Sequence, residues 1–181
     1  MHPGAEPSPE TFGTPESLII LEFLADLDTT HRLLPASPAL RAKARLFMNV
    51  VETKLTTTFI PAILGRTNLD SLLAALTELE GMLPAEGEFV LGEQWSIADA
   101  AVVPLFLRMR AMFKAQPPSM QPGEAARGFA ALESPRLKRY LEVNLARESV
   151  TKTWDEVRDG CVVPGTKLTM VLSRRTWSRT S

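Results

Sequence analysis

The stretch from Gly92 to Ala101, GEQWSIADAA, constrains the fold of this chain more than any other. Ser96 is placed to be a helix N-cap, and Asp99 follows at the position from which its carboxylate bonds back to the cap. The carboxylate also puts negative charge at the positive end of the helix dipole. The residues that follow, AAVVPLFL, are apolar almost all round, which is typical of a helix in the middle of a domain. The stretch predicts a buried helix over 97–114, although S-x-x-D alone can begin any helix.

Apolar residues at helical spacing recur along most of the chain. Prolines and Ser/Thr caps mark helix starts, and Pro61 should kink or interrupt the longest helix. No segment shows convincing strand alternation except 167–172. The prediction is an all-α bundle with short connections. The first expected helix starts at Thr14-Pro15 and carries apolar residues from Leu18 to Leu27. The second spans 38–64 with Ser37 as its N-cap, and the third runs from 68 or 70 to 83. The remaining expected helices span 97–114, start at Ser134-Pro135, and span 149–157.

Length and charge limit the function classes. At 181 residues the chain can bury a sizeable core, and one compact domain is the default. A formal net charge of −1 gives no indication of nucleic acid or an acidic membrane as the main partner. A single cysteine, Cys161, excludes an internal disulfide framework. The N-terminus lacks the features of a signal peptide and the apolar runs are too short to span a membrane, so a cytoplasmic location is expected.

The phrase around Ser96, in which Gly is followed after three residues by Ser-Ile-Ala-Asp-Ala, resembles the N-capping box of the glutathione S-transferase C-terminal domain. The order of the helices matches that domain over 33–158. Leu33-Leu34-Pro35 and then Arg41 to Arg45 look like the interdomain linker and the start of its first helix. The preceding helix resembles the last helix of the family's thioredoxin-like N-terminal domain. The sequence as a whole looks most similar to fungal omega-like members.

The resemblance implies a transferase C-terminal-like bundle over 33–158, preceded by one helix left over from the thioredoxin-like domain within 14–32. Residues 1–13 and the basic tail 159–181 are expected to be disordered. The family's catalytic Cys, Ser or Tyr belongs to the part of the thioredoxin-like domain that is missing here, so the chain is expected to be truncated and inactive alone. Helix 18–27 should expose the apolar residues that pack on that domain, and thereby favour a homodimer or a covering partner.

Glu16-Ser17 is the part of the chain for which the resemblance implies a mechanism. In the family this pair holds the γ-glutamyl end of glutathione: the acid binds the ammonium, and the Ser hydroxyl with the helix-end amides binds the carboxylate. A helix N-terminus is a ready anion site, and a charge-assisted bond from the ammonium to Glu16 would be strong. The alternative is that a Thr-Pro-Glu-Ser helix start needs no ligand, because acids and hydroxyls are favoured there anyway.

Other candidate residues carry weaker signals. By resemblance, the first long helix and the capped helix line a hydrophobic pocket for the second substrate, with Phe47, Val51, Arg108 and Met112 as candidates. The alternative is that the apolar residues are core and the arginine is solvated. Cys161 follows Asp159-Gly160 and is either a reactive thiol or an exposed tail cysteine. The two histidines are too far apart to predict a metal site, and no metal is expected.

Three function classes therefore remain. The first is a glutathione transferase relative that uses glutathione as co-substrate on small hydrophobic electrophiles, with the thioredoxin-like half supplied by the natural chain or by a partner. The second is a non-catalytic helical protein-interaction module. The third is a scaffold that keeps only an apolar ligand pocket. A large exposed apolar patch would favour the second, and a closed dry pocket between the two long helices would favour the third.

Overall fold

The computed structural model describes residues 16–154, and the following applies to that range. It is all-α, as predicted, with one isolated antiparallel bridge between Phe89 and Gly92. The elements are α1 (Ser17–Leu27), α2 (Pro38–Val50), the π-helical segment η1 (Val51–Thr56), α3 (Thr57–Ile63), α4 (Asp70–Met82), α5 (Ile97–Ala115), α6 (Glu124–Leu132), α7 (Pro135–Leu145) and α8 (Glu148–Thr151).

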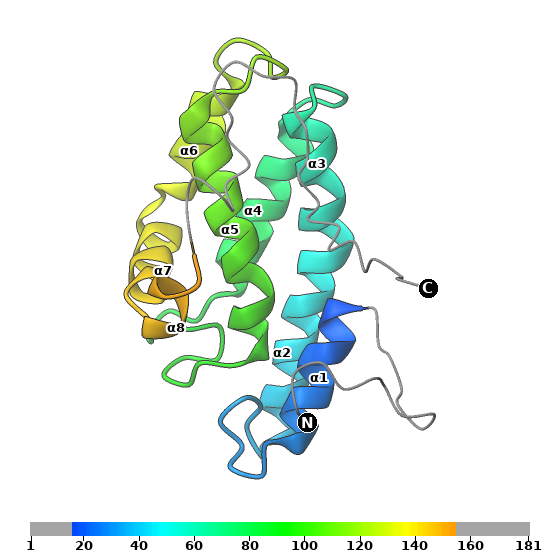
Figure 1. The fold of residues 1–181 in the computed structure, drawn as a ribbon, viewed down its shortest axis with the longest axis vertical. Helices are drawn as coiled ribbons and strands as arrows, with labels where there is room; N and C mark the ends of the chain where they lie inside the picture. The colour runs from blue at the N-terminus through cyan, green and yellow to red at the C-terminus, as the bar shows by residue number, and fades with distance from the viewer. Residues whose placement is uncertain (1–15, 155–181) are drawn as a thin grey trace, which may run out of the picture.

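Helix α5 is the central element of the bundle (Figure 1). It packs against α1, α2, α6 and α7, and α2, η1 and α3 follow one another as one long rod beside it. Phe106, Met109 and Phe113 of α5 are fully buried, which explains why its sequence is apolar on nearly every side. In the described part of the chain, no helix is both long and apolar enough to cross a membrane.

The helix ends follow the local sequence in most places. α4, α5 and α7 begin within two residues of the predicted starts. The first helix begins later than predicted: Glu16, in extended conformation, is the N-cap of α1, while the predicted cap Thr14 lies outside the described residues. Ser37 is the N-cap of α2 as predicted, although its side chain forms no capping hydrogen bond. The last helix, α8, ends at Thr151, earlier than the predicted end near 157, since residues 152–154 are not helical.

The long rod changes its winding before Pro61, where a kink was predicted. η1 spans Val51–Thr56, and α3 then continues through Pro61 to Ile63. Pro61 lacks the N–H that would donate to the carbonyl of Thr57, yet the helix continues past it, and the Leu64 N–H still donates to the Ile60 carbonyl at 3.2 Å. The prediction that Pro61 interrupts the helix was therefore wrong, and the departure from α geometry lies earlier, over Val51–Thr56.

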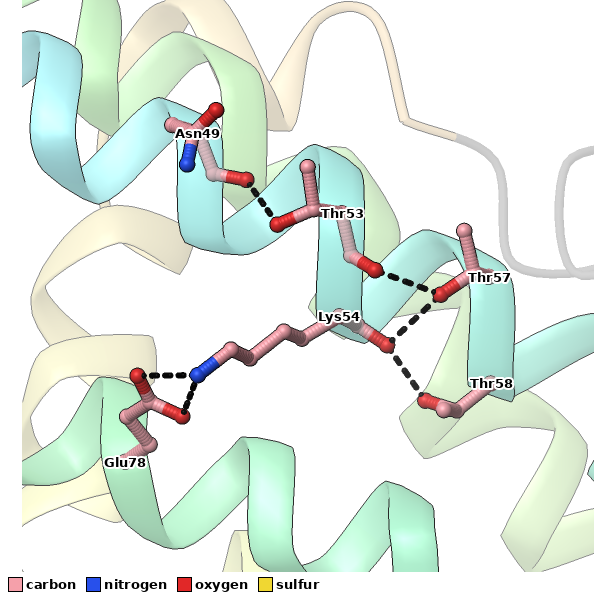
Figure 2. Close-up of polar contacts among 6 residues, drawn as sticks. All are labelled: Asn49, Thr53, Lys54, Thr57, Thr58 and Glu78. Carbon is pink, nitrogen blue, oxygen red and sulfur yellow. Dashed lines mark hydrogen bonds and ion pairs between the residues drawn. The ribbon is translucent and has the colours of Figure 1, made fainter.

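Threonine hydroxyls explain the wider winding (Figure 2). Thr53 Oγ1 donates to the carbonyl of Asn49 at 2.7 Å, and Thr57 Oγ1 and Thr58 Oγ1 donate to carbonyls one turn back at 2.7–3.2 Å. Such bonds compete with the regular helix ladder and make threonine runs poor α-helix formers. Lys54 Nζ extends from this segment and binds both carboxylate oxygens of Glu78 on α4 at 2.7 Å.

Helix α6 was not predicted. Its segment is short, contains small residues and a glycine, Gly128, and follows a proline-rich loop, but Ala125, Phe129 and Leu132 recur at helical spacing and could have predicted it. Gly128 is required by close approach: a Cβ at this position would lie 2.6 Å from the ring of Phe113 on α5. Glu124 fixes the start of α6, since its two carboxylate oxygens accept from the backbone N–H groups of Leu69 and Gln121, each at 3.1 Å.

Candidate functional site

The start of α5 is held by a buried polar network. The capping box is complete: Ser96 Oγ accepts from the first-turn backbone, and Asp99 Oδ2 accepts from the Ser96 N–H at 2.8 Å and from its hydroxyl at 3.0 Å. Asp99 Oδ1 accepts from the backbone N–H of Val90 and from the hydroxyl of Tyr140, both at 2.9 Å. Four donors thus surround one carboxylate that is 0% exposed, and they join the preceding loop, α5 and α7.

The electrostatics of this network are those of a structural site. Burial raises the pKa of Asp99 above its ordinary value, and the hydrogen bonds from Val90, Ser96 and Tyr140 act against that rise. Burial and the neighbouring Asp99 carboxylate raise the pKa of the Tyr140 hydroxyl well above its ordinary value. Neither group is accessible to a substrate. Ser96 and Asp99, predicted as a structural capping box, are found in that geometry here.

The interdomain-like linker is tied to the same helix start. Leu33 O accepts from the N–H of Ile97 at 3.0 Å, and Gln94 Nε2 donates to the carbonyl of His31 at 2.6 Å. Asp28 closes the turn after α1 by accepting from the Thr30 hydroxyl, the Thr30 N–H and the Leu33 N–H. These bonds lower the pKa of Asp28 from 3.8 to about 2. The capping box therefore also anchors the segment that carries α1.

Glu16 and Ser17 are exposed at the N-terminal end of α1. The first helical bond runs from the Ile20 N–H to the Glu16 carbonyl at 3.0 Å, so the N–H groups of Ser17, Leu18 and Ile19 have no intrahelical acceptor. The Glu16 side chain makes no capping hydrogen bond. A carboxylate and a hydroxyl thus stand beside free helix-end amides, but the role of the pair as a glutathione site stays a prediction.

The outer face of α1 is apolar and uncovered. Ile19, Phe23 and Leu27 are 56%, 59% and 62% exposed, and Ile20 and Leu24 are exposed beside them. On the other side of the helix Ala25 is buried, and Glu22 pairs with Arg45 of α2 at 2.8 Å. The prediction that this helix exposes its apolar residues is confirmed. Its consequence, association with a second copy or with a partner, stays a prediction.

The four pocket candidates lie on two helices that pack against each other. Phe47 on α2, Val51 at the start of η1 and Met112 on α5 are buried in the core. Arg108, one turn before Met112, is exposed. The three apolar side chains thus belong to the core, and Arg108 lies on the surface of α5. Their role in binding a second substrate stays a prediction.

An open cleft of about 860 Å³ lies where the turn after α1, the loop before α5 and the α7–α8 junction meet. Its most unusual side chain is Arg147, whose Cζ lies 4.5 Å from the ring centroid of Trp95 and 5.6 Å from that of Phe89. The remaining lining residues are Asp28, Thr30, His31, Arg32, Leu33, Glu93 and Gln94.

Tyr140 and Arg147 were missed as site residues. Tyr140 belongs to a predicted helix, and Arg147 follows that helix. Tyr140 was missed because it lies 41 residues in sequence from Asp99, the carboxylate it binds. Within residues 16–154, no group of three or more His, Cys, Asp or Glu side chains could hold a metal ion. Cys161 and His2 lie outside that range, and His31 lies in the wall of the cleft.

Comparison with known proteins gives consistent matches. A family model for the glutathione S-transferase C-terminal domain matches residues 61–142. The chain is similar to glutathione transferase Omega 1C from Trametes versicolor, with 35% identity and a TM-score of 0.76 over 85% of this chain and 66% of that one. It is also similar to Omega 2S from the same organism, with 38% identity and a TM-score of 0.75 over 85% of this chain and 67% of that one. Omega 2S is also known in complex with 2,4-dihydroxybenzophenone. No curated protein matched. The chain spans about two thirds of the length of these relatives.

Proposed function

The chain belongs to the glutathione S-transferase family, and on that premise we propose that it takes part in glutathione conjugation, or glutathione-dependent thiol transfer, to small hydrophobic electrophiles. The observation that carries this proposal is the position of the uncovered apolar face of α1 directly after Glu16-Ser17. In the family, the same helix presents the γ-glutamyl site at its start and packs its apolar side on the thioredoxin-like domain. In this chain, Glu16-Ser17 would likewise bind the γ-glutamyl end, and the apolar face of α1 would pack on a thioredoxin-like domain.

Glu16 and Ser17 would hold the γ-glutamyl end of glutathione. The exposed carboxylate of Glu16 is available for the ammonium, and the free N–H groups at the start of α1 with the Ser17 hydroxyl are available for the carboxylate. Charge-assisted bonds of this kind are about twice as strong as neutral ones. Residues 14–32 would thus belong functionally to the glutathione-binding half, and 33–158 would form the helical domain.

The helical domain would supply the side that binds the electrophile. Arg108 is exposed on α5, and Phe47, Val51 and Met112 are buried on α2, η1 and α5, which pack together. The π-helical segment that starts at Val51 supports this assignment, because such segments occur frequently at functional sites. Of the four residues, Arg108 is the one exposed to a ligand, and its cation suits a molecule that gains negative charge as the glutathione sulfur adds to it.

Thiol activation requires a thioredoxin-like domain on α1. In the family, that domain supplies the residue that activates the thiol. In this chain, α1 is the segment that resembles a part of that domain, its last helix. We therefore expect the chain alone to bind glutathione weakly and not to catalyse conjugation. A thioredoxin-like domain, from the natural chain or a partner, would cover Phe23 and Leu27 and complete the site.

Isothermal titration of the purified chain with glutathione tests the proposal. Binding in the millimolar range is expected, with an affinity about tenfold weaker in Glu16→Ala and in Ser17→Ala because each loses a bond to a charged group. Glu52→Ala, which removes an exposed carboxylate from η1, is the matched control and should leave the affinity unchanged. No heat from a folded chain, or equal affinity in all three variants, would reject glutathione binding at this helix.

The same apolar face favours a second candidate function, a helical protein-interaction module. Monomeric proteins rarely expose several large apolar side chains in one place without a partner. This alternative needs no glutathione site. It would be favoured if the chain bound a partner through α1 while showing no affinity for glutathione.

A further inference from the structure

Arg147 is held in an arrangement that leaves its charge without an anion. Its guanidinium lies over the rings of Trp95 and Phe89, at 4.5 and 5.6 Å, and its buried Nε has no hydrogen-bond partner in the described structure. No carboxylate of residues 16–154 pairs with it among the ion pairs found there. The side chain is half-buried, and the two rings offset part of the cost of covering it. No hydrogen bond from its terminal N–H groups to residues 16–154 is found, so these groups are available to an acceptor.

The two rings also fix the orientation of the side chain. Trp95 precedes the capping box, and Phe89 adjoins Val90, whose N–H is bound by Asp99. Both rings therefore stand on the loop that the buried network anchors. A guanidinium clamped between anchored rings is pre-organised, and its planar fork matches a carboxylate that approaches in the same plane. The cleft of about 860 Å³ next to it is large enough for a small organic molecule.

The other charges of the cleft select the charge of the ligand. Asp28 already accepts from Thr30 and Leu33, so it is not free to neutralise Arg147. Glu93 and Arg32 also line the cleft, and its four charged side chains sum to zero, although neither acid forms an ion pair with Arg147 in the described residues. Asp28 and Glu93 repel any anion at Arg147, and they repel a singly charged carboxylate less than a doubly charged phosphate.

We propose that this cleft binds a small organic monocarboxylate, with the carboxylate on the guanidinium of Arg147 and Arg32 at the rim. The body of the ligand would lie along Leu33 and Trp95. The site is separate from the glutathione end at Glu16-Ser17 and from the α2–α5 contact. It would add a ligand-recognition function to the helical domain itself, and it does not depend on the proposed conjugation activity.

Benzoate is the probe, and Trp95 is the reporter. The chain has three tryptophans, so Trp154→Phe with Trp177→Phe leaves Trp95 as the single tryptophan, next to the proposed carboxylate site. Benzoate should change the fluorescence of this chain with saturation, and the neutral isostere benzamide and inorganic phosphate should bind at least about tenfold more weakly. The Arg147 Nε–H resonance should shift with benzoate along the same curve.

Arg147→Gln should weaken benzoate about tenfold or more, and Arg147→Lys should weaken it less, since it keeps the charge but not the fork. Arg66→Gln, which removes an exposed arginine from the α3–α4 connection, is the matched control and should leave the affinity unchanged. If Arg147→Gln does not fold, Arg147→Lys and Arg32→Gln carry the test. Equal binding of benzoate and benzamide, no binding by the folded chain, or unchanged affinity in the folded Arg147 variants would overturn the proposal and leave Arg147 a structural side chain.

Discussion

The start of α5 and the outer face of α1 differ in how far the described structure supplies the contacts they need. The polar groups at the start of α5 have hydrogen-bond partners, whereas the apolar side chains on α1 are exposed. At the start of α5 every oxygen of the Asp99 carboxylate has two donors, and all the groups involved are covered. On α1, five large apolar side chains are 39–62% exposed. The linker between the two regions is fixed to the α5 start through Leu33 and Gln94.

This difference separates what the helical domain needs to fold from what it needs to work. The network around Asp99 depends only on residues of the helical domain, so it should stabilise the domain whether or not anything covers α1. The α1 face contributes little to that domain while it is exposed, because apolar area that stays in contact with water gives no hydrophobic stabilisation. Substitutions at the start of α5 should therefore lower the free energy of unfolding. Substitutions on the α1 face should change association and leave the free energy of unfolding nearly unchanged.

Asp99→Ala should have the largest effect. It leaves four donors without an acceptor, three of which belong to Ser96 and Val90 and the fourth to Tyr140. We expect the free energy of unfolding to fall by about 3 kcal/mol or more, measured by urea denaturation. Asp70→Ala is the control: this carboxylate is in the first turn of α4 but is exposed and pairs only with Arg127 there. Its loss should cost less than about 1 kcal/mol. Equal losses would contradict the special role of the network.

Tyr140→Phe should have the next largest effect, about 1–2 kcal/mol, because it removes one donor and keeps the ring that packs edge-on against Phe106. The sharper measurement is a double-mutant cycle. In the Asp99→Ala background the hydroxyl has lost its acceptor, so Tyr140→Phe should then cost little or even stabilise. Additive costs would mean that Tyr140 acts through packing and not through Asp99.

How far the sequence could predict these two regions depended on the range of the interactions. The capping box was readable because Ser96 and Asp99 are neighbours on one helical turn. The role of Tyr140 was not predictable, because its hydrogen bond to Asp99 joins residues that are 41 positions apart in sequence. The rings of Trp95 and Phe89 likewise meet Arg147 only after α7 has packed. A kink or interruption was predicted at Pro61, where a rule for a single residue applies, whereas the π-helical winding lies over Val51–Thr56, where several threonine hydroxyls bond to backbone carbonyls, and it was not predicted. The exposure of α1 was foreseen through the family resemblance, since its composition alone would suit a buried helix.

The pH dependence should show a smaller effect, with opposite signs for the two aspartates. Asp28 has its pKa lowered to about 2 by bonds from Thr30 and Leu33. Its contribution to stability is therefore present above pH 3.8 and is lost as the pH falls toward 2. The difference in unfolding free energy between the wild type and Asp28→Asn should be constant at neutral pH and shrink in that window. Asp99, with its pKa raised by burial, favours the folded state more as the pH falls. A difference that grows on acidification would contradict the assignment of Asp28.

The smallest effect on stability should come from the α1 face. Phe23→Glu with Leu27→Lys keeps the net charge and places an acid one turn before a base, an arrangement that supports a helix. Because both side chains are mostly exposed, the free energy of unfolding should change by less than about 0.5 kcal/mol. Self-association in sedimentation velocity should nevertheless decrease. Ala25→Glu is the control on the same helix, since Ala25 is buried and a charge there should destabilise the packing of α1. If the double variant unfolds as readily as Ala25→Glu, the face is part of the core of this domain. If association stays unchanged, the contact surface lies elsewhere and α1 is not what draws a partner.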